Sequence, residues 1–229
     1  MISHTAPDRS CSGVALAGGP SERFEGCAKG LLEVGSVRII DRVLLALRGA
    51  TERQFVAARA GAPPELYALD VPVHTDLRPP LERGSLIGLH TALSAAGGDV
   101  LVVAWDMPFV SPELLRALRT LGERTHSAAV PEGPDGLEPL CAYYPHATLD
   151  IIERQLARGE LRLGTLLDVL PARATLTRDD VARFGDPAYL FSNVNSPADL
   201  AAAERWLART GRAGASDHQS SHLSSPART

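Results

Sequence analysis

Short apolar runs alternate with amphipathic segments of helical length through the first 130 residues. The strand-like runs are 14–17, 54–58, 71–75, 100–104 and 126–130, and the helical patterns cover 39–47, 85–96 and 112–121. The run at 100–104, VLVVA, is the most continuous and is typical of a central parallel strand covered on both faces. This alternation predicts an α/β fold built on a doubly wound, mostly parallel sheet.

The second half of the chain continues with mixed elements. The pattern predicts strands at 140–144 and 174–177, helices at 148–157 and 163–170, and a final helix from Pro197 to about Arg209 with Ser196 as its N-cap. Residues 1–12 and 211–229 are polar and lack an apolar pattern, so we expect disordered tails. The interpretation is a single domain over residues 13–210.

A glycine-rich loop follows the first predicted strand. Gly18, Gly19, Pro20 and Ser21 carry no bulky side chains, and glycine N–H groups at a strand exit can form a concavity that binds anions. Arg23 and Lys29 come next along the chain, so loop 18–29 has the parts of a polyphosphate site.

Two acids stand at the ends of other predicted strands. Asp76 follows the run 71–75, and Asp106 follows the run 100–104 after one intervening residue. Ligands of doubly wound sheets bind at the carboxyl ends of the strands, so loop 18–29, Asp76 and Asp106 are expected on one edge. An Asp after a strand is also a common turn residue, and both acids keep that alternative.

The commonest phosphate motifs do not describe this loop. A P-loop requires G-x-x-x-x-G-K-[ST], whereas Lys29 is followed by Gly30, and the dinucleotide fingerprint G-x-G-x-x-G is absent. A nicotinamide-dependent oxidoreductase is therefore disfavoured.

Composition narrows the setting. With 229 residues and a net charge of −4, the chain offers no electrostatic reason to bind nucleic acid or an anionic membrane. It contains no apolar run of membrane-spanning length, and its three cysteines form no C-x-x-C pair. We expect a cytoplasmic monomer.

Lys29 is the single lysine among 23 basic residues, which suggests a position that requires a compact ammonium. A reaction at a polyphosphate needs a phosphate cradle, a cation and a carboxylate for a metal ion. Lys29 fits the cation, Arg23 is a weaker second candidate, and Asp106 is the best candidate for Mg²⁺.

The segment from Leu16 to Lys29 resembles the signature L-A-G-G-x-S-x-R-x-x-G-x-x-K of nucleotidyltransferases, and in particular that of the molybdenum cofactor guanylyltransferases. The resemblance implies a Rossmann-like fold of the nucleotide-diphospho-sugar transferase type. It also implies that Lys29 and the loop grip the triphosphate of GTP, that Asp106 in its D-x-P segment is the Mg²⁺ ligand, and that Asp76 contacts the nucleotide. The nucleotide-binding positions implied in the loop are Leu16, Ala17, Gly18, Gly19 and Ser21.

Two later segments extend the resemblance. The stretch from Gly84 to Leu89 looks like the family's G-P-L-x-G element, and Asn193 to Pro197 matches an N-V-N-[TS]-P element on the side of the pterin substrate. Asn193 and Asn195 could exchange hydrogen bonds with a pterin or a phosphate, or could simply form the turn before the last helix.

Four positions depart from the usual pattern of the family. Trp105 stands where Cys is common, Glu25 where many members have Gly, Ser85 where Pro is usual, and Ala58 where Asn is frequent. These departures leave the choice of nucleotide and the catalytic rate open.

The implied reaction joins GMP from GTP to the terminal phosphate of molybdenum-bound molybdopterin and releases pyrophosphate. Molybdoenzymes or their chaperones would receive the product. Use of CTP or another small phosphate acceptor stays open, although LAGG in place of LAAG argues against CTP. A non-catalytic carrier of the molybdenum cofactor is the alternative from another class.

Overall fold

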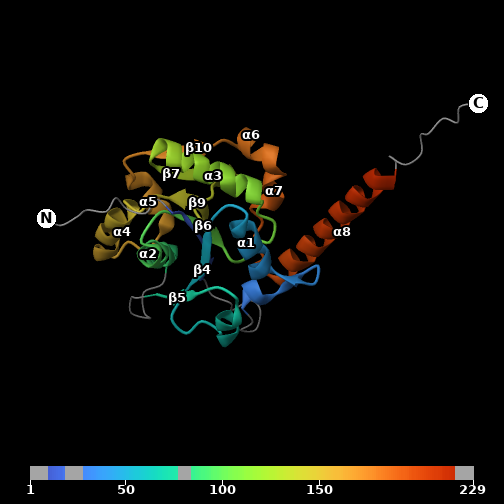
Figure 1. The fold of residues 1–229 in the computed structure, drawn as a ribbon, viewed down its shortest axis with the longest axis horizontal. Helices are drawn as coiled ribbons and strands as arrows, with labels where there is room; N and C mark the ends of the chain where they lie inside the picture. Colours follow the sequence, from blue (N-terminus) through green and yellow to red (C-terminus); the bar gives the residue numbers. More distant parts are fainter. Residues whose placement is uncertain (1–9, 19–27, 77–83, 220–229) are drawn as a thin grey trace, which may run out of the picture.

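The computed structural model describes residues 10–18, 28–76 and 84–219. An eight-stranded sheet forms the centre of the molecule, with helices on both faces (Figure 1). Its strands are β1 (Ser12–Ala17), β4 (Arg53–Ala58), β5 (Val73–Thr75), β6 (Val100–Ala104), β7 (Ala128–Gly133), β8 (Gly136–Leu137), β9 (Cys141–Tyr144) and β10 (Arg173–Leu176). A separate two-stranded hairpin consists of β2 (Glu33–Val34) and β3 (Val37–Arg38).

The strand order is β10-β7-β9-β6-β1-β4-β5, with β8 paired to β7. β1 lies between β4 and β6 and is parallel to both. β9 is the exception, since it runs antiparallel to β6 and β7. The connection from β7 to β9 passes only through the short strand β8, which is too short for the crossover that parallel strands need. The predicted α/β class and the mostly parallel sheet are confirmed.

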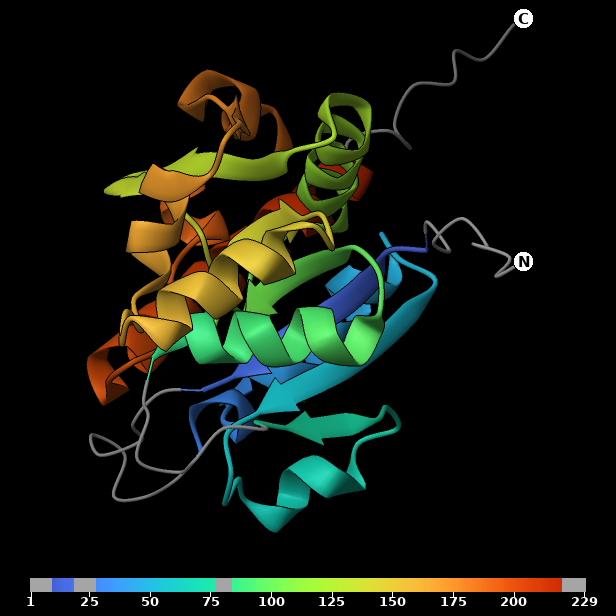
Figure 2. The ribbon, with the colours of Figure 1, turned by 90° about the vertical axis from the view of Figure 1, so that its left-hand side faces the viewer.

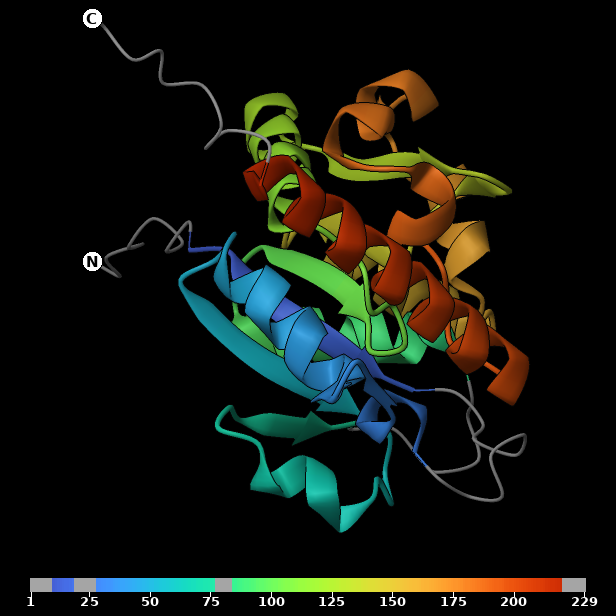
Figure 3. The ribbon, with the colours of Figure 1, turned by 90° about the vertical axis from the view of Figure 1, so that its right-hand side faces the viewer.

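Two helical layers cover the sheet, and alternate residues of β1 enter the hydrophobic cluster under each. The helices of the first layer are α2 (Ser85–Ala96), α4 (Thr148–Ala157) and α5 (Leu163–Val169), and those of the second are α1 (Ile39–Arg48), α3 (Pro112–Thr125) and α8 (Pro197–Gln219). Val14 and Leu16 join the cluster under the first layer, whereas Ala15 and Ala17 join the cluster under the second. Figures 2 and 3 show these two helical layers from opposite sides.

Shorter helices complete the fold. They are the 3-10 helices η2 (Lys29–Leu31), η3 (Pro64–Ala68) and η4 (Ala182–Phe184), together with α6 (Arg178–Val181) and α7 (Pro187–Leu190). The predicted N-cap of the last helix is confirmed, since the Asp199 N–H donates to Ser196 Oγ at 3.3 Å. No helix in the described part of the chain combines the length and apolar character needed to cross a membrane.

Several predicted boundaries need correction. α3 continues past Leu121 to Thr125 and stops at His126, whose left-handed backbone (φ 50°) ends the helix, so the predicted strand at 126–130 begins only at Ala128. The polar sequence after Leu121 hid this last turn, in which Gly122 fits against the ring of Tyr143.

The expected tails are also shorter than predicted. Cys11 is buried and Ser12 already belongs to β1, because the central strand begins before its first large apolar residue. At the other end α8 runs to Gln219 instead of stopping near Arg209. The predicted disorder of residues 1–9 and 220–229 concerns positions outside the described residues.

Candidate active site

Three segments far apart in the sequence meet at the carboxyl ends of β1 and β6. The backbone N–H of Trp105 donates to Leu16 O at 3.2 Å, which ties the exit of β6 to the end of β1. The N–H of Val194 donates to Asp106 O at 2.9 Å, so the segment before α8 is attached to the same exit. The third segment is the turn η2, which begins with Lys29.

A side-chain hydrogen bond connects the turn η2 with the segment before α8. Lys29 Nζ donates to Asn195 Oδ1 at 2.6 Å, across 166 positions of sequence. The Asn195 backbone N–H in turn donates to Asp199 Oδ2 at 2.9 Å, within the first turn of α8. Because hydrogen bonds from charged donors are stronger than neutral ones, this contact aligns Lys29 with the asparagine segment.

Asp106 lies within the electrostatic influence of Lys29. Burial raises the pKa of the Asp106 carboxyl above its usual value, and the positive charge of Lys29 lowers it again only in part. Binding a cation would relieve this unfavourable burial of negative charge. The predicted pair of cation and carboxylate is therefore present as a spatial pair.

A metal ion at this place would not be enclosed by side chains of the described residues alone. In the part of the chain that the structure describes, no group of three or more His, Cys, Asp and Glu side chains could enclose a metal. Mg²⁺ often binds through one or two carboxylates and completes its shell with substrate phosphates and water. Asp106 fits that donor set.

Asp76 lies apart from this group. It follows β5, and the sheet order places β4 and β1 between β5 and β6. Three strand spacings amount to about 14 Å, so Asp76 and Asp106 cannot hold the same ion. Asp76 Oδ1 accepts a hydrogen bond from Thr91 Oγ1 at 2.9 Å, and burial is the main cause that raises the pKa of Asp76.

Gly84 has a packing reason to be glycine. A Cβ at this position would lie 2.7 Å from Leu161 Cβ, closer than side chains pack. Ser85, which replaces the usual Pro, accepts a hydrogen bond from the Leu163 N–H at 3.3 Å. The start of α2 is thus held against the segment before α5, and contact of Gly84 with the nucleotide stays a prediction.

The two asparagines differ in their surroundings. Asn195 is partly buried and accepts the hydrogen bond from Lys29. Asn193 is exposed, and its amide donates to Phe191 O at 3.2 Å. This contact is of the kind that a turn residue makes, and contact of Asn193 with the pterin stays a prediction. Only Asn195 is brought to the predicted cation.

The glycine loop is described in part. Leu16 and Ala17 are buried at the end of β1, so any contact with a ligand would come from their backbone. A Cβ added at Gly18 would meet no atom of the described residues within 4 Å, so packing against these residues does not require a glycine there. Gly19, Ser21 and Arg23, and the Glu25 departure, lie outside the described residues.

Sequence reasoning missed two contacts at the site. It did not foresee that Lys29 meets Asn195, because it assigned these residues to different substrates. It noted Trp105 only as a departure, but the structure packs the indole ring against Gly30, directly after Lys29. The combination of a large ring at 105 with glycine at 30 was the available signal.

A mostly parallel α/β sheet that carries a lysine and a carboxylate at the carboxyl ends of adjacent strands is the arrangement of an α/β nucleotidyltransferase. Comparison with known proteins agrees, because residues 13–174 match the MobA-like NTP transferase domain. The chain belongs to the MobA-like NTP transferase family.

Individual relatives extend the match beyond that domain. The molybdenum cofactor guanylyltransferase of Desulfosudis oleivorans is 30% identical over 194 residues, which cover 84% of this chain and 94% of the relative. A probable molybdenum cofactor guanylyltransferase of Pelotomaculum thermopropionicum is 34% identical over 206 residues, or 89% of this chain and 96% of the relative.

A solved structure supports the same fold. The molybdopterin-guanine dinucleotide biosynthesis protein A of Archaeoglobus fulgidus superposes with a TM-score of 0.74 at 28% identity. The superposition covers 86% of this chain and 99% of that protein. The match therefore includes the region of Asn195, which lies beyond residue 174.

Proposed function

We propose that this chain transfers GMP from GTP to the terminal phosphate of molybdenum-bound molybdopterin, giving the guanine dinucleotide form of the cofactor and pyrophosphate. The names of two relatives support this activity, and the alignments with them cover most of this chain and of each relative. The observation that carries the proposal for the site is the convergence of Lys29, Asp106 and Asn195 through two hydrogen bonds.

The chemistry places modest demands on the protein. A phosphate oxygen of the pterin substrate attacks the α-phosphorus of GTP, and the bond from that phosphorus to the bridging oxygen of the β-phosphate breaks. The electron pair leaves with pyrophosphate. Because the attacking phosphate is already anionic, no general base is needed, and catalysis consists of alignment and neutralisation of charge.

Lys29 supplies the mobile positive charge. Its ammonium donates to the neutral oxygen of Asn195. Triphosphate oxygens are stronger acceptors, so the ammonium would turn toward them when GTP binds. Arg23 would add a second cation from the loop.

Asp106 is the residue that would hold Mg²⁺. The ion would neutralise charge on the α-phosphate and the leaving pyrophosphate when bound. The partly buried carboxylate, with its pKa raised by burial, favours this use over a solvent-exposed turn acid.

The remaining site residues are assigned by position. The backbone of Leu16, Ala17, Gly18 and Gly19, together with Ser21, would cradle the triphosphate. Asp76 and Gly84 would line the nucleotide side of the site. By strand spacing, Asp76 lies about 14 Å from the metal ligand Asp106. Asn195, with Asn193 beside it, would face the pterin.

One assay tests the activity. Purified protein is incubated with Mg²⁺, molybdenum-loaded molybdopterin and each of the four nucleoside triphosphates, and pyrophosphate release is measured. We expect release with GTP to exceed that with the other nucleotides. Equal or faster release with CTP would overturn the guanylyl assignment, and no release with any nucleotide would favour a carrier.

The described cysteines bear on the cellular setting. The described cysteines, Cys11 and Cys141, are free and buried, as is usual in a reducing compartment. We propose that the protein acts in the cytoplasm as a monomer and passes its product to molybdoenzymes or their chaperones.

A further inference from the structure

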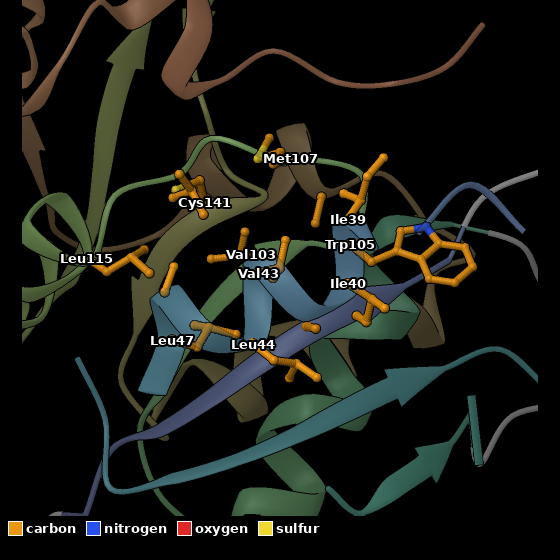
Figure 4. Packing of buried hydrophobic residues seen from close by; sticks show 14 of the residues in the cluster. Ile39, Ile40, Val43, Leu44, Leu47, Val103, Trp105, Met107, Leu115 and Cys141 are labelled. Carbon is orange, nitrogen blue, oxygen red and sulfur yellow. The ribbon is translucent and has the colours of Figure 1, made fainter. Parts of the chain in front are cut away.

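Trp105 lies between the two groups proposed for catalysis. In sequence it directly precedes Asp106, and in space its ring packs on Gly30, which directly follows Lys29. The indole is 4% exposed, and Figure 4 shows it at the end of the apolar cluster opposite Leu115.

The contact between Trp105 and Gly30 leaves no space for a side chain. A Cβ added at Gly30 would lie 2.7 Å from Cδ2 and 3.1 Å from Cγ of the indole. The ring is rigid, and its backbone is held by the hydrogen bond to Leu16 O. Gly30 therefore fits directly against this ring.

The same contact fixes the turn that carries Lys29. The turn is tight, because the Leu31 N–H donates to Ala28 O at 2.9 Å and the Leu32 N–H donates to Lys29 O at 3.1 Å. A tight turn moves as a unit, so the surface on which Gly30 rests sets the position of the Lys29 backbone. That position decides whether the ammonium reaches Asn195.

We propose that Trp105 is a positioning residue, whose ring acts as a spacer that sets the separation between the Lys29 turn and Asp106. The reason for this separation rests on the proposed function: it would match the spacing of the cation and the carboxylate to a triphosphate. The placement of Lys29 itself can be measured without the reaction.

The indole nitrogen distinguishes the ring from its hydrogen-bonding group. Nε1 of Trp105 is buried and has no hydrogen-bond partner among the described residues. An unpaired buried donor is unfavourable. Among the described contacts, the ring atoms therefore provide the packing against Gly30, and the N–H contributes no hydrogen bond. The ring atoms near Gly30 have counterparts in phenylalanine.

Lys29 provides a specific probe because it is the single lysine of the chain. The rate at which an amine-acylating reagent modifies Lys29, followed by peptide mass spectrometry, reports how well the ammonium is held. We compare wild type with Trp105→Phe, which keeps a ring face, and Trp105→Leu, which is apolar but not flat. Trp206→Phe is the matched control, since Trp206 lies on α8 and packs against Phe109 and Tyr189, away from Lys29 in the sequence.

The spacer predicts a clear order of effects. Acylation of Lys29 rises severalfold in Trp105→Leu and stays near wild type in Trp105→Phe and Trp206→Phe. The ratio kcat/KM for GTP falls by about 10- to 100-fold in Trp105→Leu only, since a misplaced catalytic group costs that much. Circular dichroism and melting temperature verify that each variant is folded.

A double-mutant cycle tests the contact directly. Gly30→Ala adds a methyl group that would push the turn away from the ring, so it should raise the rate of Lys29 acylation. In the Trp105→Leu background the same change should have a smaller effect on this rate. If the two changes are independent, or if Trp105→Phe behaves like Trp105→Leu, the spacer role is wrong. If acylation follows the predicted order but wild type releases no pyrophosphate, the proposed function fails and the positioning of Lys29 stands.

Discussion

Lys29 and Asn195 form a 2.6 Å hydrogen bond although the family resemblance assigns them to different substrates. The proposed function places Lys29 on the triphosphate side and Asn195 on the pterin side. The bond therefore marks the border between the two proposed subsites. If triphosphate oxygens replaced the amide as the partner of Lys29, the Asn195 oxygen would be free to accept a hydrogen bond from the second substrate.

Replacement of Asn195 tests this border. Asn195→Ala should lower the free energy of unfolding by about 1 kcal/mol, the usual net contribution of a partly exposed hydrogen bond. It should raise KM for the pterin substrate more than KM for GTP. Chemical denaturation and two-substrate initial rates measure the two effects.

Asn193→Ala is the matched control, because Asn193 is exposed and its amide donates to Phe191 O. It should raise KM for the pterin substrate less than Asn195→Ala does and leave KM for GTP nearly unchanged. Equal effects of the two alanine variants on the pterin KM would contradict the assignment of Asn195.

Lys29 and Asp106 should be separable by a Mg²⁺ titration. Asp106→Asn should reduce transfer by at least about 100-fold at limiting Mg²⁺, because a neutral amide is a poorer ligand, and excess Mg²⁺ should restore part of the rate. Lys29→Ala should lose about 100- to 1000-fold with little recovery, and Lys29→Arg should rescue it poorly because the guanidinium is planar and wider. Initial rates of pyrophosphate release across the titration provide the test. A near wild-type rate for Asp106→Asn at limiting Mg²⁺ would remove Asp106 as the metal ligand.

The raised pKa of Asp106 predicts the sign of a stability change. A carboxyl whose pKa is higher in the folded protein favours folding below its unfolded pKa, near 3.8, and this contribution is lost as the pH rises through the folded pKa. Without metal or nucleotide, Asp106→Asn should therefore raise the melting temperature at pH 7. The difference should disappear as the pH approaches 3.8. Thermal melts in chelator at several pH values check this, and a lower melting temperature for the variant at pH 7 would show that the attraction to Lys29 outweighs the burial.

Removal of residues 212–229 should leave both turnover and melting temperature nearly unchanged. The aromatic contacts of α8 come from Trp206, which packs on Phe109 and Tyr189 with ring centroids 4.3 and 4.8 Å away. Arg209 adds a hydrogen bond to the Tyr189 hydroxyl at 3.1 Å. All of these contacts precede residue 212. A fall of several degrees in the melting temperature would show that the removed segment contributes to the packing.

The local pattern of the sequence determined the elements and the fold class. The helices Ser85–Ala96 and Thr148–Ala157 and the strand Val100–Ala104 begin and end as predicted. Their apolar spacing reports directly which face is buried, and that information is contained within each segment. The single lysine and the acids after strands likewise marked the candidate chemistry, because strand ends in such sheets converge on one edge.

Only the tertiary structure decided which of these residues meet. The antiparallel direction of β9 follows from a connection too short for a crossover, and the sheet order separates Asp76 from Asp106 by two intervening strands. The bond from Lys29 to Asn195 and the contact of Trp105 with Gly30 join segments 166 and 75 positions apart. Hydrophobic periodicity carries no information about partners at such distances, since it records burial alone. The partner of each residue depends on strand order and helix packing, which are set by closure of the whole chain around the sheet.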